Sequence, residues 1–174
     1  MLRVQRFTSL IEVLKIIGIV FVVAVLIRYF LFQPFVVEGS SMEPAYHSGE
    51  YLFIEKVSYR VNEPERGDVI VFKYPNNPSI NYIKRIIGLP GETISIKEGR
   101  VYINDQLLSE PYLTPETKTI VDKDPSASYE ITLPKDNYFV MGDNRDHSSD
   151  SRSGWLLPDE YIVGKSAVTI YSQK

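Results

Sequence analysis

One long apolar run constrains how this chain can fold. From Val13 to Phe32 the sequence reads VLKIIGIVFVVAVLIRYFLF, twenty residues in which only Lys15 and Arg28 are charged. A helix that crosses a bilayer needs about 20 mostly apolar residues, and the stretch between the two charges is apolar on every face. Arg28 lies near the outer end, where its long side chain can reach the headgroups. Residues 1–32 are therefore predicted to form a short tip and a transmembrane anchor.

Neither a core helix nor a cleaved signal peptide fits this run as well as an anchor does. A core helix of a globular domain has a polar stripe where it meets water, and none is present here. A cleaved secretory signal peptide has a shorter apolar core and a small-x-small cleavage site, whereas Gln33-Pro34-Phe35 follows this run.

Charges are distributed unevenly about the anchor. Residues 1–32 carry four basic side chains and one acidic one, whereas the remaining 142 residues carry 15 basic and 21 acidic ones. The basic residues before the apolar core are Arg3, Arg6 and Lys15, and the first acidic residues after it are Glu38, Glu43 and Glu50. The positive-inside rule then predicts a single-pass protein of the cell membrane. Its N-terminus is cytoplasmic, and residues 33–174 form an extracytoplasmic domain.

The remaining composition excludes several classes of protein. The chain has no cysteine, which excludes a disulfide scaffold, a zinc finger and an iron–sulfur site. Its only histidines are His47 and His147, too few for a multi-histidine metal centre. A net charge of -3 gives no basic surface for nucleic acid. We therefore expect no metal, no other cofactor and no nucleic-acid partner.

The domain after the anchor has the pattern of antiparallel β structure. Short runs rich in Val, Ile, Tyr and Phe alternate with turn residues, and no helix is predicted among them. Glu98-Gly99 has the composition of a tight hairpin turn, and 111–128, which has three prolines, is predicted as a surface loop or extension. The predicted strands are 51–57, 68–74, 82–88, 93–97, 100–104, 129–133, 138–141 and 162–171.

Two segments carry a candidate nucleophile and a candidate base. Gly39-Ser40-Ser41-Met42-Glu43-Pro44 places serines in a turn just past the anchor, and a serine hydroxyl needs a nearby base to act as a nucleophile. Tyr82-Ile83-Lys84-Arg85 reads as a strand, in which Lys84 and Arg85 point to opposite faces. Burial of Lys84 would lower its pKa from ~10.4 to about 8, with Arg85 acting in the same direction, and would make it a general base. Taken alone, the turn is better explained as an ordinary serine-rich turn, and the two cations are better explained as solvated edge-strand charges.

A third segment, Met141 to Arg152, is almost entirely polar. Its alternating Asp and Arg residues allow ion pairs that would hold a loop rigid. A calcium loop is excluded because, in a loop that begins at Asp143, Gly154 stands at the twelfth position, where Glu is required. A Ser-His-Asp triad that uses His147 stays open at this point. A fourth segment, Arg66 to Phe72, is a turn that leads into a strand.

Together the segments GSSMEP, RGDVIVF, YIKRIIGLPGE and MGDNRDHSSDSR, downstream of one anchor, resemble the type I signal peptidases of bacteria. The resemblance extends from Arg28 to Lys165, and the short chain with a single anchor is similar to the compact enzymes typical of Gram-positive bacteria. It implies a mainly β fold of the signal peptidase type, with an N-terminal transmembrane helix and an antiparallel β catalytic domain. It also implies a membrane-anchored serine endopeptidase that uses a Ser-Lys dyad. Its partners would be the lipid bilayer and the signal peptides of exported preproteins, cleaved after small-x-small sites such as Ala-x-Ala.

The resemblance also implies a role for individual residues. Ser41 is the nucleophile, Lys84 the general base, and Ser148 the serine that orients that lysine. Asp143, Arg145, Asp150 and Arg152 match ion-paired residues that brace the site. The Ser41 N–H supplies one oxyanion donor; Gly39 stands where some members carry a second donor hydroxyl, so a backbone group or water must replace it. The groove is implied to be lined by Phe35, Val37, Met42, Tyr82 and Ile83, whereas Tyr46 stands where leucine is common and His47 matches no role.

Three rival functions are less well supported. A Ser-Lys self-cleaving regulator is soluble and carries a DNA-binding module, whereas this chain carries an anchor. A Ser-His-Asp hydrolase would depend on His147 and not on Lys84. An anchored β module that only binds exported proteins would need neither Ser41 nor Lys84.

Overall fold

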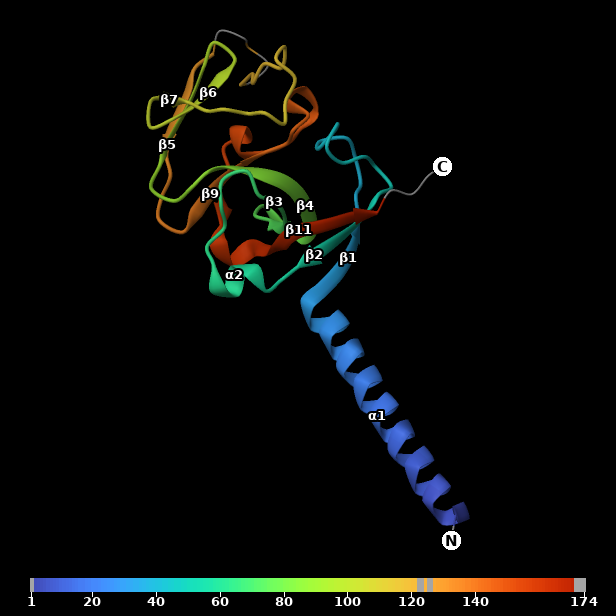
Figure 1. Cartoon of the computed structure of the whole chain (residues 1–174). Coiled ribbons are helices and arrows are strands. Elements are labelled where there is room, and N and C mark those ends of the chain that lie inside the picture. The colour runs from blue at the N-terminus through green and yellow to red at the C-terminus, as the bar shows by residue number, and fades with distance from the viewer. Residues whose placement is uncertain (1, 122–123, 125–126, 171–174) are drawn as a thin grey trace.

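Two antiparallel sheets follow an N-terminal helix in the computed structural model of this chain (Figure 1). The structure describes residues 2–121, 124 and 127–170, and it describes their side chains except at 2–9, 26–32, 60 and 168–170. The helix points away from the sheets, and the segments that carry the candidate nucleophile and base lie in and beside the larger sheet.

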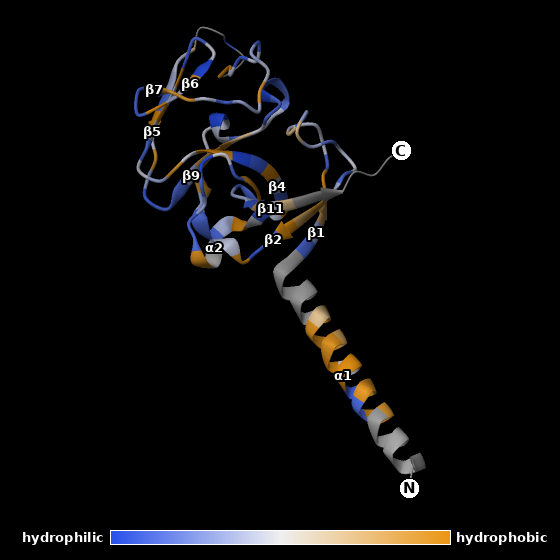
Figure 2. Ribbon diagram, viewed as in Figure 1, coloured by the Kyte–Doolittle hydropathy of each residue, from blue (hydrophilic) through white to orange (hydrophobic). Residues whose placement is uncertain are grey.

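Helix α1 runs from Leu2 to Leu31 and continues directly into the first strand. Most of its described side chains are apolar (Figure 2), and the residues from Leu10 to Val25 are exposed on all sides of the helix. Among the residues that the structure describes, no helix is long and apolar enough to cross a membrane. The side chains of Arg3, Arg6 and Arg28 lie outside the described residues, so the membrane anchor and its orientation stay predictions.

The larger sheet has seven strands in the order β1-β2-β11-β3-β4-β9-β10. Within it, β3 pairs with β4, and β11 pairs with both β2 and β3. Lys84 on β4 lies opposite Ile70 on β3. The bounds are β1 Phe32–Val36, β2 Tyr51–Glu55, β3 Val69–Tyr74, β4 Asn77–Gly88, β9 Asn137–Met141, β10 Leu157–Pro158 and β11 Ile162–Ile170.

The smaller sheet has four strands in the order β7-β6-β5-β8. Glu98 and Gly99 close the β5–β6 hairpin with φ of 54° and 75°, a conformation that two-residue hairpin turns require. This confirms the predicted turn. The bounds are β5 Thr93–Lys97, β6 Arg100–Ile103, β7 Gln106–Leu107 and β8 Tyr129–Thr132.

The core follows from the two-residue period of the strands. On β3, Ile70 and Phe72 pack in one apolar cluster, whereas Val71 packs in another on the opposite face. A further cluster joins the smaller sheet to the ends of β4 and β9, through residues such as Ile94 and Phe139. The larger sheet is thus buried on both faces where β3 and β4 run, which holds the Lys84 segment of β4 in a rigid frame.

All eight predicted strands are present, with residue 171 of the last one outside the described residues, so the mainly antiparallel β fold is confirmed. The prediction that no helix follows the anchor is wrong in detail, because α2 spans Ser58–Val61 and three 3-10 turns occur at Arg145–His147, Ser151–Ser153 and Asp159–Tyr161. Each of these has three or four residues, too few for a hydrophobic period to appear in the sequence. The two-residue strands β7 and β10 were not predicted for the same reason, whereas β1 has five residues and begins at Phe32, which was assigned to the anchor.

Candidate active site

Ser41 lies on the loop that joins β1 to β2. This loop is closed at its base by backbone hydrogen bonds from Val37 N to Glu50 O and from Gly49 N to Val37 O. Its tip is tied to the 142–152 segment, because Asn144 donates from its backbone N to Ser41 O at 3.0 Å and from Nδ2 to Ser40 O at 3.1 Å. The loop therefore holds Ser41 at a fixed place beside β4.

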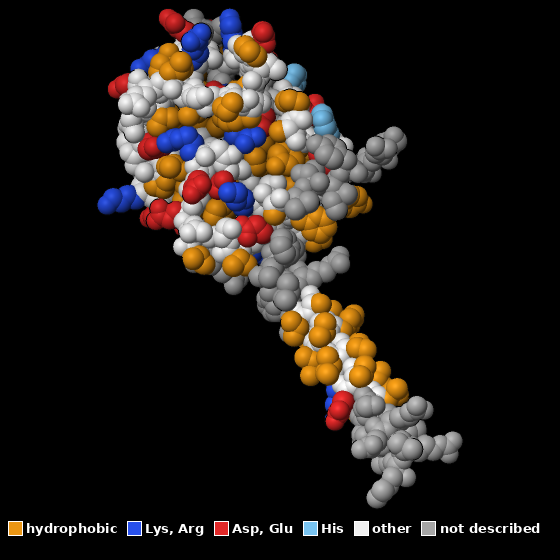
Figure 3. Space-filling model, in the orientation of Figure 1, with side chains coloured by type: hydrophobic (Ala, Val, Ile, Leu, Met, Phe, Trp, Pro, Cys, Tyr) orange, Lys and Arg blue, Asp and Glu red, His pale blue; other side chains and the backbone are white. Residues whose placement is uncertain are grey.

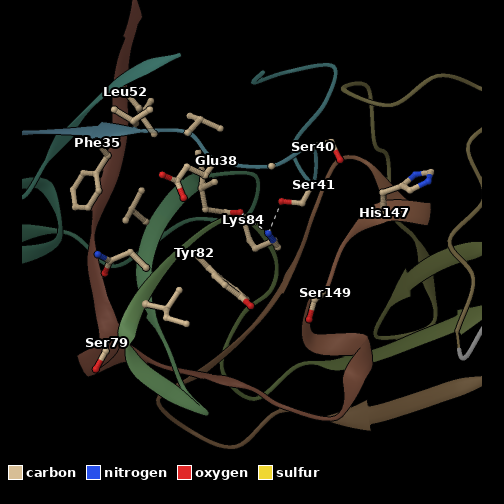
Figure 4. A pocket seen from close by; sticks show the side chains of 17 residues that line it. Phe35, Glu38, Ser40, Ser41, Leu52, Ser79, Tyr82, Lys84, His147 and Ser149 are labelled. Atoms are coloured by element: carbon tan, nitrogen blue, oxygen red, sulfur yellow. Dashed lines mark hydrogen bonds between the residues drawn. The ribbon is translucent and has the colours of Figure 1, made fainter. Parts of the chain in front are cut away.

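Lys84 reaches Ser41 from β4. Its Nζ lies 2.7 Å from Ser41 Oγ and donates to Ile83 O at 2.8 Å, and the side chains of Lys84 and Ser41 point toward one another (Figure 4). The two residues are 43 positions apart in the sequence. An amine within hydrogen-bond distance of a serine hydroxyl is the geometry that an activated nucleophile needs.

Burial makes Lys84 a weaker base than an exposed lysine. The residue is only 4% exposed. This desolvation lowers the pKa of Lys84 to about 8, even though the carboxylates of Asp150 and Asp143 act in the opposite direction. The direction agrees with the expectation from the strand pattern. Arg85 was expected to lower the pKa of Lys84 as well. It is not among the causes of the shift, since its guanidinium faces Asp143 and is neutralised there.

Three buried ion pairs surround this pair of residues. Asp150 binds Arg152, with Arg152 Nε 2.8 Å from Asp150 Oδ1, so this pair lies within the predicted polar segment. The other two partners come from elsewhere in the chain. Asp143 receives two hydrogen bonds from Arg85 at 2.8 and 2.6 Å, and Arg145 Nη2 lies 2.5 Å from Glu110 Oε1.

The segment after β7 supplies partners that no sequence motif predicted. Glu110 and the Thr119 hydroxyl accept hydrogen bonds from Arg145, and the Tyr112 ring lies 4.0 Å from the Arg85 guanidinium carbon. The Ile120 carbonyl accepts from Arg152 at 2.8 Å. All of these partners except Glu110 belong to the predicted 111–128 loop, which therefore covers the arginines of the site. No periodicity marks Glu110 or Thr119, so the sequence offered no signal for them.

We expect Glu110→Ala to destabilise the protein. The Arg145 side chain is 1% exposed, so the substitution leaves a buried guanidinium without its carboxylate. Breaking a buried pair from one side costs about 3–5 kcal/mol, of which the remaining bonds of Arg145 to Thr119 and Gly142 O offset a part. Urea unfolding followed by circular dichroism measures this loss.

Glu130→Ala is the matched control for Glu110→Ala. Glu130 pairs with Lys97 at 3.4 Å, and both side chains are about half exposed or more. Exposed pairs contribute about 0–1 kcal/mol. Equal losses in the two variants would show that the Arg145 pair does not brace the fold.

Gly142 packs directly against the Ser41 backbone and the Ser148 side chain. A Cβ atom at this position would collide with the Ser41 carbonyl oxygen and with Ser148 Oγ. Ser148 Oγ itself is buried and has no hydrogen-bond partner among the described residues. Ser148 therefore lies beside Ser41, but its expected hydrogen bond to Lys84 is absent from the described bonds, and its orienting role stays a prediction.

A cleft of about 590 Å³ opens beside Ser41 and Lys84. Four of the five predicted groove residues line it, namely Phe35, Val37, Tyr82 and Ile83. Met42, which belongs to the β1–β2 loop, does not line it and is only 1% exposed. The cleft extends past the serine to His147 and Ser149, and the His147 ring points away from Ser41 (Figure 4).

The remaining predicted positions lie around this cleft. Gly39 also lines it, has a φ of +89°, and donates its N–H to Ser48 Oγ at 3.2 Å. Tyr46 OH lies 2.9 Å from Ser166 Oγ, and His47 lies 3.8 Å from Glu43 at the surface. Both histidines are exposed on one face of the domain (Figure 3). Within the described ranges, no group of three or more His, Asp or Glu side chains could hold a metal ion.

Comparisons with known proteins agree with this geometry. The family model described as signal peptidase, peptidase S26, matches residues 10–171. The chain is 42% identical to signal peptidase I of Bacillus licheniformis over 170 residues, which cover 96% of this chain and 91% of the relative. It is 42% identical to signal peptidase I T of Bacillus subtilis over 161 residues, covering 90% and 83%. A crystal structure of a signal peptidase I from Enterococcus faecalis matches with a TM-score of 0.53 and 32% identity, over 62% of this chain and 99% of that one.

Proposed function

This chain belongs to the signal peptidase family, peptidase S26, and from that premise we propose that Ser41 and Lys84 form its Ser-Lys dyad. Membership makes the chain a signal peptidase I, a serine peptidase that removes signal peptides. The proposal adds the residues, the cleavage site and the membrane anchor. The observation that carries it is the 2.7 Å approach of Lys84 Nζ to Ser41 Oγ at the wall of a cleft.

The proposed reaction has two stages. The neutral amine of Lys84 takes the proton of Ser41 as Oγ attacks the scissile carbonyl carbon, and the resulting ammonium returns a proton to the leaving amine. The signal peptide is then an ester of Ser41. Lys84 activates a water molecule that hydrolyses this ester and releases the free serine.

The backbone N–H of Ser41 is the proposed oxyanion donor. No described hydrogen bond uses it, so it is available to a developing negative charge. The N–H of Gly39 is already bonded to Ser48 Oγ, which supports a different backbone group or a water molecule as the second donor.

The substrate is proposed to bind as an extended strand in the cleft. β1 is an edge strand of the larger sheet, and β4 before Arg85 pairs only with β3 in the described ladders, so both offer unpaired backbone groups. A peptide laid between them would pair backbone to backbone, and its alternate side chains would enter the cleft. The apolar walls contributed by Phe35 and Ile83 suit uncharged side chains such as the alanines of an Ala-x-Ala site.

The proposed membrane anchor is α1. Its exposed apolar side chains from Leu10 to Val25 are costly in water and stable in a bilayer. Ser41 lies only nine residues beyond the end of the predicted span at Phe32. An extracytoplasmic domain on this anchor would therefore hold its cleft near the membrane surface, where a signal peptide presents its cleavage site.

The pH dependence of cleavage tests Lys84 as the base. Only the neutral amine can accept the proton, and its pKa is about 8. We therefore expect kcat/KM to rise about tenfold per pH unit below about pH 8 and to level off above it. A rate that stays flat from about pH 6 to 9 would exclude a titrating lysine.

Parallel cleavage by two variants distinguishes the dyad from a Ser-His-Asp triad. The substrate is a preprotein with an Ala-x-Ala site, and the enzyme is the full chain in detergent. We expect Lys84→Ala to abolish cleavage, whereas His147→Ala still cleaves the preprotein. The reverse result would move the base to His147. A folded wild-type chain with lipid supplied that cleaves nothing would favour the anchored binding module.

A further inference from the structure

A stack of aromatic rings supports the wall of the cleft. Tyr82 lines the cleft, whereas Tyr74, whose ring packs against that of Tyr82, does not line it. The two rings are stacked, with centroids 4.5 Å apart and planes 15° apart. Trp155 meets Tyr74 edge to face at 5.4 Å, so the support continues into the core.

The elements that carry these rings are fixed by the sheet. Tyr74 and Tyr82 come from the neighbouring strands β3 and β4, where Phe72 pairs with Tyr82 in register. Trp155 follows the 3-10 turn Ser151–Ser153, is 7% exposed, and also contacts the Phe72 ring at 6.0 Å. Such pairs contribute about 0.5–1.5 kcal/mol each beyond the burial of their surface. The Tyr82 ring therefore has little freedom to move back from the cleft.

The same ring lies beside the reacting groups. Lys84 Nζ is 5.2 Å from the centroid of Tyr82, and both side chains are seen together in Figure 4. A change in the position of this ring would alter the width of the cleft within a few ångströms of Ser41. Hydrophobic pockets discriminate by about 10–200-fold per methylene when their walls are fixed.

We propose that Tyr74 and Trp155 are positioning residues that determine substrate specificity. They hold the Tyr82 ring forward, so that the cleft accepts small side chains beside the scissile bond and rejects larger ones. This inference rests on the proposed function, because it assumes that the signal peptide occupies this cleft. Without Tyr74 the Tyr82 ring can retreat into the vacated space, and the cleft widens.

Cleavage of matched peptides by Tyr74→Ala tests the inference. The peptides carry Ala or Leu at the third position before the scissile bond, or Ala or Val immediately before it. We expect Tyr74→Ala to lower the wild-type preference for alanine by about tenfold or more at one of these positions, while it still cleaves the all-alanine peptide. An unchanged preference at both positions, in a variant that folds, would overturn the proposal.

Two controls separate positioning from general loss of packing. Tyr74→Phe keeps the stacked ring and loses only the surface hydrogen bond from Asn76, so it should keep the wild-type preference. Tyr129→Ala removes a ring that pairs with Phe139 at 5.8 Å in the apolar cluster that joins the smaller sheet to β4 and β9. It should destabilise the protein without changing the preference for alanine. Relaxed preference in Tyr129→Ala would mean that any packing defect has this effect, and would contradict the proposal.

Fluorescence distinguishes failure of this inference from failure of the proposed function. Trp155 is the only tryptophan of the chain. Peptide binding to the wild-type chain or to Ser41→Ala should change its emission, and the Kd of the leucine peptide divided by the Kd of the alanine peptide should fall in Tyr74→Ala. Selective binding without cleavage by the wild type would contradict the proposed reaction and leave this inference standing. A wild-type chain that neither binds nor cleaves the peptides would contradict both the proposed reaction and this inference.

Discussion

Replacing Lys84 with methionine is expected to abolish cleavage and, at the same time, to stabilise the fold. Methionine fills nearly the same volume but cannot accept the proton of Ser41, which lies 2.7 Å away in the wild type. Loss of a general base costs about 100–10,000-fold in rate. Because this lysine is also the activator of the nucleophile, we expect the largest loss of this range or more. Initial rates with an Ala-x-Ala peptide measure it.

The gain in stability has a definite pH dependence. Burial lowers the folded-state pKa of Lys84 to about 8 from an ordinary value of 10.5, so the buried ammonium opposes folding by roughly 3 kcal/mol at low pH. Above about pH 8 the folded lysine loses its proton before the unfolded one does, and this cost disappears by about pH 10.5. The advantage of Lys84→Met, about 1–3 kcal/mol after its lost hydrogen bonds, should therefore be greatest below pH 8 and shrink above it.

Urea unfolding of the wild type and Lys84→Met at pH 7 and at pH 10 measures this difference. If Lys84→Met is inactive and is also less stable than the wild type at pH 7, the loss of activity would be assigned to misfolding and not to the missing base. An active variant would remove Lys84 from the mechanism.

Gly142→Ala is expected to lower activity by about 100-fold in the folded protein. The new methyl group would collide with the Ser41 carbonyl oxygen and Ser148 Oγ, so the loop that carries Ser41 must move. A shift of about 1 Å in a reacting group can cost about 100-fold in rate. The kcat/KM of the variant, corrected for its folded fraction, checks this expectation.

Gly164→Ala provides the matched control for Gly142→Ala. A Cβ atom there would collide with the Glu55 carbonyl oxygen and the Ile54 side chain, on β2 and not beside Ser41. It should lower the free energy of unfolding yet leave kcat/KM of the folded fraction within about twofold. If both variants lose activity equally per folded molecule, the effect of Gly142 is not local to the site.

The strands could be predicted because they alternate or are buried on both faces. Val69 to Phe72 reads as a continuous apolar run, which is what a strand with two buried faces requires. The same local reasoning found the 98–99 turn, where two consecutive residues adopt positive φ. It failed for α2 and for β10, which are two to four residues long and depend on tertiary contacts.

The pairing of Ser41 with Lys84 could not be derived from the pattern alone. Strand alternation indicated that one cation of the pair at 84 and 85 could be buried, but not that a loop 43 residues earlier meets it. The resemblance to a family supplied that expectation. Glu110 lies in a segment without strands, and its contact with Arg145 depends on how that segment folds over the site.

The stack behind Tyr82 could not be predicted for a similar reason. Tyr74 and Tyr82 are on neighbouring strands, but a register shift after Lys73 decides which residues meet. Trp155 arrives from a turn 73 residues later than Tyr82. Aromatic residues in a β protein are usually core, and only the geometry connects these three to the cleft.

The central claim, that Ser41 is the nucleophile of a signal peptidase, is tested most directly by a thiol at that position. The chain contains no cysteine, so Ser41→Cys introduces a single reactive thiol. Mass spectrometry identifies the products formed from an Ala-x-Ala preprotein by the wild type, Ser41→Ala and Ser41→Cys, each with and without N-ethylmaleimide. We expect the wild type to cut after the second alanine regardless of the reagent, Ser41→Ala to make no product, and Ser41→Cys to make the same product only without the reagent. Cleavage by Ser41→Ala, or cleavage by Ser41→Cys that survives complete alkylation, would contradict the claim.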